Sequence, residues 1–70
     1  MSSMGTMTVN GSPWEGPAGI TVTELVSIWC PSPRGIAVAR NGDVVPKSAW
    51  HVTTLGAGDT IEIVTAAAGG

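Results

Sequence analysis

Residues 21–29 read TVTELVSIW, and this segment decides the fold because it predicts the helix against which the rest of the chain can pack. Thr21 and Glu24 have the spacing of a capping box: the Thr21 hydroxyl caps the first turn, and Glu24 reaches back to the Thr21 amide. The apolar residues fall on one stripe at i, i+3, i+4 and i+7, namely Val22, Leu25, Val26 and Trp29. Prolines at positions 31 and 33 forbid continuation, so the helix is expected to end near Cys30.

A hairpin is predicted before this helix. Residues 6–9 alternate threonine with apolar side chains, and Asn10-Gly11 can supply the two positive-φ residues of a tight turn into residues 12–15. Pro13 cannot donate a ladder hydrogen bond, so the returning strand is expected at a sheet edge. Residues 1–5 have no periodicity and are expected to form a flexible N-terminal tail, with the native start at Met1 or Met4.

A second hairpin and a last strand are predicted after the helix. Residues 36–39 alternate, Asn41-Gly42 repeats the turn signal, and Pro46 stops the returning strand. Residues 47–55 have no clear period, although three of them are heavy enough to fill a core: Trp50, Val52 and Leu55. Residues 60–65 alternate isoleucine with polar side chains and give the clearest strand in the chain.

These elements predict one amphipathic helix lying across one face of a four- or five-stranded sheet, an α+β architecture. The expected domain covers residues 6–65, and residues 66–70 are expected to form a flexible C-terminal tail that ends in Gly-Gly.

Length and charge exclude several classes of function. A chain of 70 residues makes one domain with few residues left to wall a catalytic pocket, so an enzyme is not expected. Three basic residues against five acidic ones give a net charge of −2 without a basic cluster, which disfavours nucleic-acid binding. No segment has the apolar length of a membrane span, and no secretory signal is evident, so the cytoplasm is the expected compartment.

The polar and aromatic side chains favour structural roles over catalytic ones. With a single cysteine and a single histidine, Cys30 and His51, the chain can build neither a disulfide nor a Cys/His metal site, and both residues are expected to be structural. Asp59 and Glu62 are interpreted as solubilising charges. The three tryptophans lack interleaved basic residues and so do not predict base stacking. Trp29 and Trp50 are expected in the core, and no position is predicted for Trp14.

The unusual feature is the end of the chain, Ala66-Ala67-Ala68-Gly69-Gly70. Gly69 and Gly70 lack Cβ atoms, so this backbone can thread a narrow channel in another protein. A free carboxylate is a poor electrophile, and ATP can activate the Gly70 carboxylate as an acyl-adenylate that a nucleophile then attacks. The tail therefore predicts a substrate and carrier, with an inert chain end as the alternative.

Four stretches, together with this Gly-Gly end, are similar to a known family. They are Val9-Asn10-Gly11, residues 21–25 (TVTEL), residues 35–50 (GIAVARNGDVVPKSAW) and residues 58–65 (GDTIEIVT). Over nearly the whole chain from Met7, the sequence resembles the ThiS family, the sulfur carriers of thiamin biosynthesis within the ubiquitin-like β-grasp proteins. The run from Pro46 to Trp50 is the most particular to this branch. The resemblance implies a mixed sheet and a β-grasp topology.

The resemblance also implies a mechanism. An E1-like adenylyltransferase of the ThiF type would adenylate Gly70 with ATP, and a persulfide sulfur donor would replace AMP to leave a Gly70 thiocarboxylate. Thiazole synthase, of the ThiG type, would take that sulfur, while Gly69, Ala68, Ala67 and Ala66 thread the partner's active site. The carrier would bind no cofactor, would be a monomer when free, and would interact with neither nucleic acid nor membrane.

Two departures from the family pattern are Lys47, where many relatives carry arginine, and the plain alanines before Gly69. Three alternatives remain open: a molybdopterin synthase small subunit or another thiocarboxylate carrier, a ubiquitin-like modifier joined through Gly70 to a lysine, and an interaction module with an inert tail.

Overall fold

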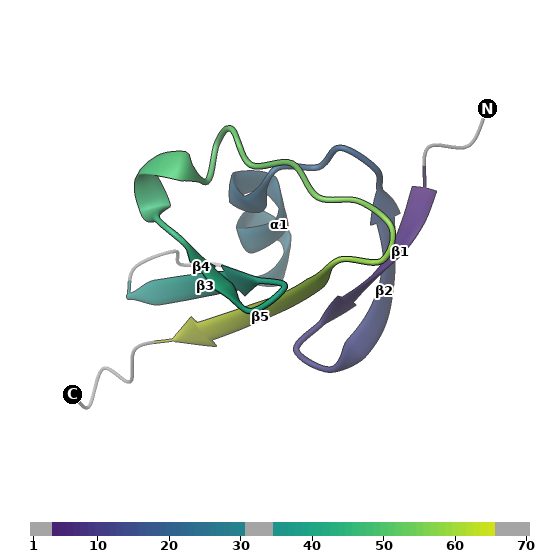
Figure 1. Cartoon of the computed structure of the whole chain (residues 1–70), viewed down its shortest axis with the longest axis horizontal. Helices are drawn as coiled ribbons and strands as arrows, with labels where there is room; N and C mark the ends of the chain where they lie inside the picture. Colours follow the sequence, from purple (N-terminus) through teal and green to yellow (C-terminus); the bar gives the residue numbers. More distant parts are fainter. Residues whose placement is uncertain (1–3, 31–34, 66–70) are drawn as a thin grey trace.

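The computed structural model describes residues 4–30 and 35–65 of the chain, and Figure 1 shows their arrangement. The elements in chain order are β1 (Met4–Val9), β2 (Ser12–Pro17), α1 (Val22–Trp29), β3 (Ile36–Arg40), β4 (Asp43–Val45), a short 3₁₀ helix (Lys47–Ala49) and β5 (Thr60–Thr65). The strands form a five-stranded sheet in the order β2-β1-β5-β3-β4. The pair β1–β5 is parallel and the other pairs are antiparallel, which confirms the predicted α+β fold with a mixed sheet.

Both predicted hairpins form around their Asn-Gly steps. Asn10 and Asn41 each have φ 51°, and the glycines that follow have φ 82° and 88°. Positive φ at both central residues is what a two-residue type I′ turn requires, and its twist matches that of the flanking strands. The prediction of an edge position for the strand that contains Pro13 is also confirmed, because β2 is the first strand of the sheet.

The two prolines of β2 lie where they protect this edge. Thr8 N donates to Asp59 O, just before β5, and Thr6 O accepts from Gly58 N, so the backbone N–H and C=O groups of the alternate residues of β1 face β2. Their partners on β2 therefore face β1, and Pro13 and Pro17 face the free edge. Proline lacks an N–H, so this edge offers few donors to another strand.

The helix begins as the capping box predicts and covers one face of the sheet. Thr21 Oγ1 accepts from Glu24 N at 3.1 Å, and Thr21 N donates to Glu24 Oε1 at 2.9 Å. Side chains from the helix, the sheet and the connections share one core: Met7, Val9, Ile20, Val22, Leu25, Val26, Val38, Trp50, Leu55, Ile61 and Ile63. In the described part of the chain, no helix has the length and hydropathy needed to span a membrane.

The connection before β5 contributes Trp50 and Leu55 to this core, as predicted. Trp50 Nε1 donates to Val45 O at 2.9 Å, which ties the indole to the end of β4. Lys47 Nζ lies 5.7 Å from the centroid of the Trp50 ring, within reach of a cation–π interaction. Lys47 therefore places a positive charge against the ring of Trp50.

The structure corrects the predicted N-terminal tail of residues 1–5. Strand β1 begins at Met4, with Met4 opposite Pro17 and Gly5 opposite Gly16. A Cβ atom at Gly5 would lie 3.0 Å from the Ala57 Cβ, so glycine here lets the connection before β5 pack closely against β1. Because glycine has no side chain to show alternation, the sequence pattern misses this end of the strand.

Two predicted core residues are exposed. Val52 is 66% exposed and lies in the connection that follows the 3₁₀ helix, and Trp29 is 37% exposed at the last position of α1. The Trp29 ring meets the Trp14 ring of edge strand β2 in a T-shaped contact, with centroids 6.3 Å apart and an interplanar angle of 77°. The predicted stripe is therefore correct for its first three residues, whereas its last residue reaches the rim of the sheet, where only part of the ring is covered.

Candidate functional site

The predicted site residues Ala66, Ala67, Ala68, Gly69 and Gly70 lie outside the described residues, directly after β5. What the structure does describe is the strand that leads to them. Strand β5 lies between β1 and β3, and Ile61 and Ile63 anchor it in the core (Figure 1). The last residue of β5, Thr65, lies opposite Ile36 of β3. Strand β5 is therefore paired with β3 up to the residue that precedes residues 66–70.

The sheet face opposite α1 carries a small apolar patch next to this exit. Ile63 and Val38 point into the core, so their neighbours along the strands, Val64 and Ala37, face outward as a cross-strand pair. Ala39 and Val44 form the next pair on the same face. We call these four residues the outer patch: Ala37, Ala39, Val44 and Val64.

The outer patch is open to solvent and has an acidic neighbour. Val44 is 73% exposed and Val64 is 58% exposed. Glu62 faces the same side, opposite Ala39. Sequence reasoning missed this patch, although the alternation in residues 60–65 places Val64 on the side opposite Ile63 and was the signal that could have revealed it.

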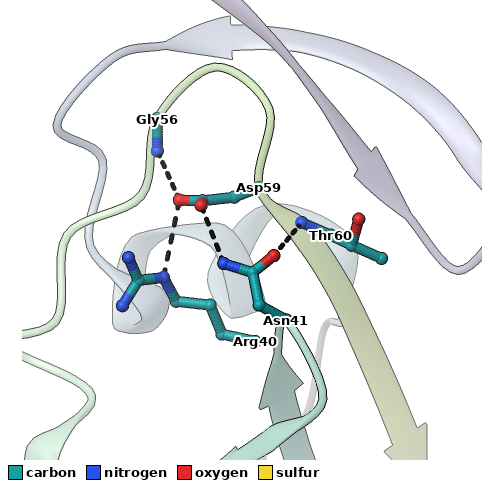
Figure 2. Close-up of polar contacts among 5 residues, drawn as sticks. All are labelled: Arg40, Asn41, Gly56, Asp59 and Thr60. Carbon is teal, nitrogen blue, oxygen red and sulfur yellow. Dashed lines mark hydrogen bonds and ion pairs between the residues drawn. The ribbon is translucent and has the colours of Figure 1, made fainter.

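A polar cluster holds the beginning of β5, as Figure 2 shows. The carboxylate of Asp59 accepts from Asn41 Nδ2 at 3.1 Å and from Gly56 N at 2.9 Å. Arg40 Nε lies 3.5 Å from Asp59 Oδ2 and completes an ion pair. The interpretation of Asp59 as a solubilising charge is therefore wrong, because its side chain, only 16% exposed, joins the β3–β4 turn to the loop before β5.

The cluster also sets the ionisation of this carboxylate. Partial burial raises the pKa of Asp59, but the hydrogen bonds from Gly56 and Asn41 and the charge of Arg40 together outweigh it, so the pKa lies below its ordinary value. The Asp59 side chain is thus an ionised structural acceptor at neutral pH.

We expect this arrangement to make the domain sensitive to acid. A carboxylate whose pKa is lower in the folded state stabilises the fold above its unfolded pKa, and that contribution is lost as the pH falls through the folded pKa. Asp59→Asn should lower the free energy of unfolding at neutral pH by about 1–2 kcal/mol and flatten its dependence on pH below about 4. Urea unfolding across this range measures both effects. Asp43→Asn, at an exposed carboxylate outside the cluster, is the control, and an Asp59→Asn variant as acid-sensitive as the wild type would contradict the prediction.

Cys30 and His51 are not brought together. His51 follows Trp50, whose carbonyl accepts from Thr23 N at the start of α1. Cys30 lies at the other end, where it caps the helix by donating its N–H to Val26 O. An eight-residue helix is about 12 Å long, so a thiol–imidazole pair cannot form. Cys30 packs partly buried against the core and His51 is exposed. Over residues 4–30 and 35–65, no three His, Cys, Asp or Glu side chains gather as ligands for a metal ion.

A five-stranded mixed sheet in the order β2-β1-β5-β3-β4, covered on one face by a single helix, defines a ubiquitin-like β-grasp protein. Within this class, the chain belongs to the ThiS family, whose model matches residues 7–70. That match includes the Gly69-Gly70 end.

Two solved structures from Geobacter metallireducens are similar to the chain. The first is a crystal structure of the thiamine biosynthesis protein ThiS, with 34% identity, a TM-score of 0.80 and coverage of 93% of this chain and 99% of that one. The second is a solution structure of a thiamine biosynthesis protein, with 34% identity, a TM-score of 0.71 and coverage of 84% and 80%. Comparison with curated proteins found no significant match.

Proposed function

We propose that this protein carries sulfur for the synthesis of the thiazole ring of thiamin, as a thiocarboxylate on Gly70. The observation that carries the proposal is the match of the ThiS family to residues 7–70, which runs to the terminal Gly-Gly. Two similar structures of thiamine biosynthesis proteins support the same pathway. The carrier itself is a substrate, and partner enzymes perform the chemistry.

The proposed chemistry has three steps on Gly70. In an adenylyltransferase of the ThiF type, the Gly70 carboxylate attacks the α-phosphorus of ATP, and pyrophosphate leaves. A persulfide then attacks the carbonyl carbon and displaces AMP to give an acyl disulfide. A second thiol cleaves the S–S bond, which leaves the thiocarboxylate on Gly70 and a disulfide on the donor side. Because the activating enzyme consumes the ATP, the carrier needs no bound cofactor. The proposed compartment is the cytoplasm, where ATP is available.

The outer patch favours a docking role next to this tail. Val64 belongs both to the patch and to the strand that leads to residues 66–70, so a partner that covers the patch also meets the start of the tail. Glu62 adds a negative charge at the edge of the apolar surface. We propose that the activating enzyme contacts this face with apolar side chains and a basic residue opposite Glu62, and that Gly69 and the three alanines enter its active site.

Intact-mass analysis of the protein from sulfur-replete cells tests the proposal. Replacement of one carboxylate oxygen by sulfur should raise the mass by the difference between these two atoms, and deletion of Gly70 should abolish the increment. The thiocarboxylated protein should then support thiazole formation with thiazole synthase and not molybdopterin formation with molybdopterin synthase. Sulfur delivery to the molybdopterin enzyme alone would overturn the pathway, and a mass increase by a whole protein would identify a modifier instead.

A further inference from the structure

The two Asn-Gly turns do more than reverse the chain, because each asparagine side chain bonds to a main-chain amide of β5. Asn10 Oδ1 accepts from Ile63 N at 2.7 Å, and Asn41 Oδ1 accepts from Thr60 N at 2.9 Å (Figure 2 shows the second contact). The main-chain N–H groups of the same two asparagines donate to β5 as well: Asn10 N to Ile61 O at 2.9 Å and Asn41 N to Thr60 O at 2.7 Å.

This pattern is that of a strand residue whose carbonyl has been replaced. In a parallel ladder, a residue that donates to Ile61 O also accepts from Ile63 N through its own carbonyl. Asn10 has φ 51°, so its backbone has already turned into the hairpin, and its side-chain carbonyl supplies the acceptor instead. An asparagine amide has the same acceptor as a peptide group, carried on one methylene, which suits it to both tasks.

Asn10 acts at the end of β5 that leads to the tail. Strand β3 accompanies β5 from Ile61 to Thr65, whereas β1 pairs only with Thr60 and Ile61. Over the described residues, the Asn10 side chain makes the last hydrogen bond that β5 receives on its β1 side. Asn41 makes its equivalent bond at Thr60, the first residue of β5 and the one farthest from the tail.

We propose that Asn10 is a positioning residue for the C-terminal tail: its side-chain carbonyl holds Ile63 and so fixes the direction in which the chain leaves the sheet at Thr65. This inference rests on the proposed carrier function. When the acceptor is lost, only a fraction of the folded carrier presents the tail in the direction that the activating enzyme binds. The apparent affinity of the enzyme for the carrier is then the intrinsic affinity multiplied by this fraction.

The test compares variants at two matched positions. Asn10→Gly keeps the left-handed turn and removes the acceptor, and Asn10→Ser removes it in a second way because the hydroxyl is too short to reach Ile63. Asn10→Asp keeps an acceptor oxygen and should rescue the defect. Asn41→Gly is the control, because it removes the corresponding bond and also a contact to Asp59, and should therefore cost at least as much stability.

The readouts are steady-state adenylation of each folded carrier by a ThiF-type enzyme, amide hydrogen exchange of Ile63, and urea unfolding. Asn10→Gly and Asn10→Ser should raise KM for the carrier by about threefold to tenfold with kcat almost unchanged, and speed exchange at Ile63 by a similar factor. Asn10→Asp should restore both values, and Asn41→Gly should leave KM within about twofold of the wild type despite its lower stability.

Two outcomes overturn the inference while leaving the carrier function in place. One is that KM for the carrier rises in proportion to the loss of folding stability, so that Asn41→Gly raises KM at least as much as Asn10→Gly does. The other is a KM unchanged in both variants that lack the acceptor. If the wild type is not adenylated at all, the proposed function fails and this inference fails with it, a result distinguishable from the first two by the wild-type rate alone.

Discussion

Removal of Gly69 and Gly70 is expected to abolish adenylation of this protein by a ThiF-type enzyme while leaving its free energy of unfolding unchanged. All the buried apolar side chains of the described core lie between Met7 and Ile63, and the last strand ends at Thr65. Deletion of two residues withdraws the carboxylate by up to about 7 Å, far more than the displacement that an enzyme tolerates between reacting atoms.

ATP–pyrophosphate exchange and transfer of AMP measure the activation, and urea unfolding measures the stability. Deletion of residues 1–3, at the other end of the chain and before β1, is the matched control and should change neither quantity. A truncated protein that still accepts AMP at the wild-type rate would contradict the assignment of Gly70 as the reacting residue.

Leu25→Ala is expected to cost about 2–5 kcal/mol of folding free energy, because it removes a fully buried side chain and leaves a cavity between α1 and the sheet. Small domains are stable by about 5–15 kcal/mol in total, so this one change should remove a large share of the stability. The midpoint of urea unfolding measures the loss.

Ile28→Ala is the control for Leu25→Ala on the same helix. Ile28 is 60% exposed, so its truncation should cost no more than about 0.5 kcal/mol. Equal losses at positions 25 and 28 would show that helix propensity, and not burial against the sheet, governs the stability of α1.

Much of the fold could be predicted from the sequence because its signals are local. The capping box, the two Asn-Gly turns and the alternation in residues 60–65 each depend on residues a few positions apart, and all of them form as predicted. The Gly-Gly end of the proposed site is likewise a linear signal, and it needs no tertiary structure to be seen.

The predictions that failed concern the edges of elements, where burial depends on neighbours distant in sequence. Gly5 has no side chain to reveal the start of β1, and the residue that packs closely against it, Ala57, is distant in sequence. Trp29 follows the helical stripe, yet it is 37% exposed, and its ring meets Trp14 of edge strand β2 rather than the centre of the sheet. Val52 is apolar and near Trp50, but its connection presents it to solvent.

The sequence by itself determined the elements, most of the core and the Gly-Gly chain end on which the proposed function rests, since periodicity, turn chemistry and a terminal motif are written in consecutive residues. Only the tertiary structure decided which polar side chains hold β5. The bond that Ile63 N donates to Asn10 joins residues 53 positions apart. The bond that Asn41 donates to Asp59 spans 18 positions, and the one that Asn41 accepts from Thr60 spans 19. An asparagine in an Asn-Gly turn is fully explained by its φ, so nothing in the local pattern reveals that its side chain also replaces a strand carbonyl; that role exists only once the sheet brings the turn against the strand.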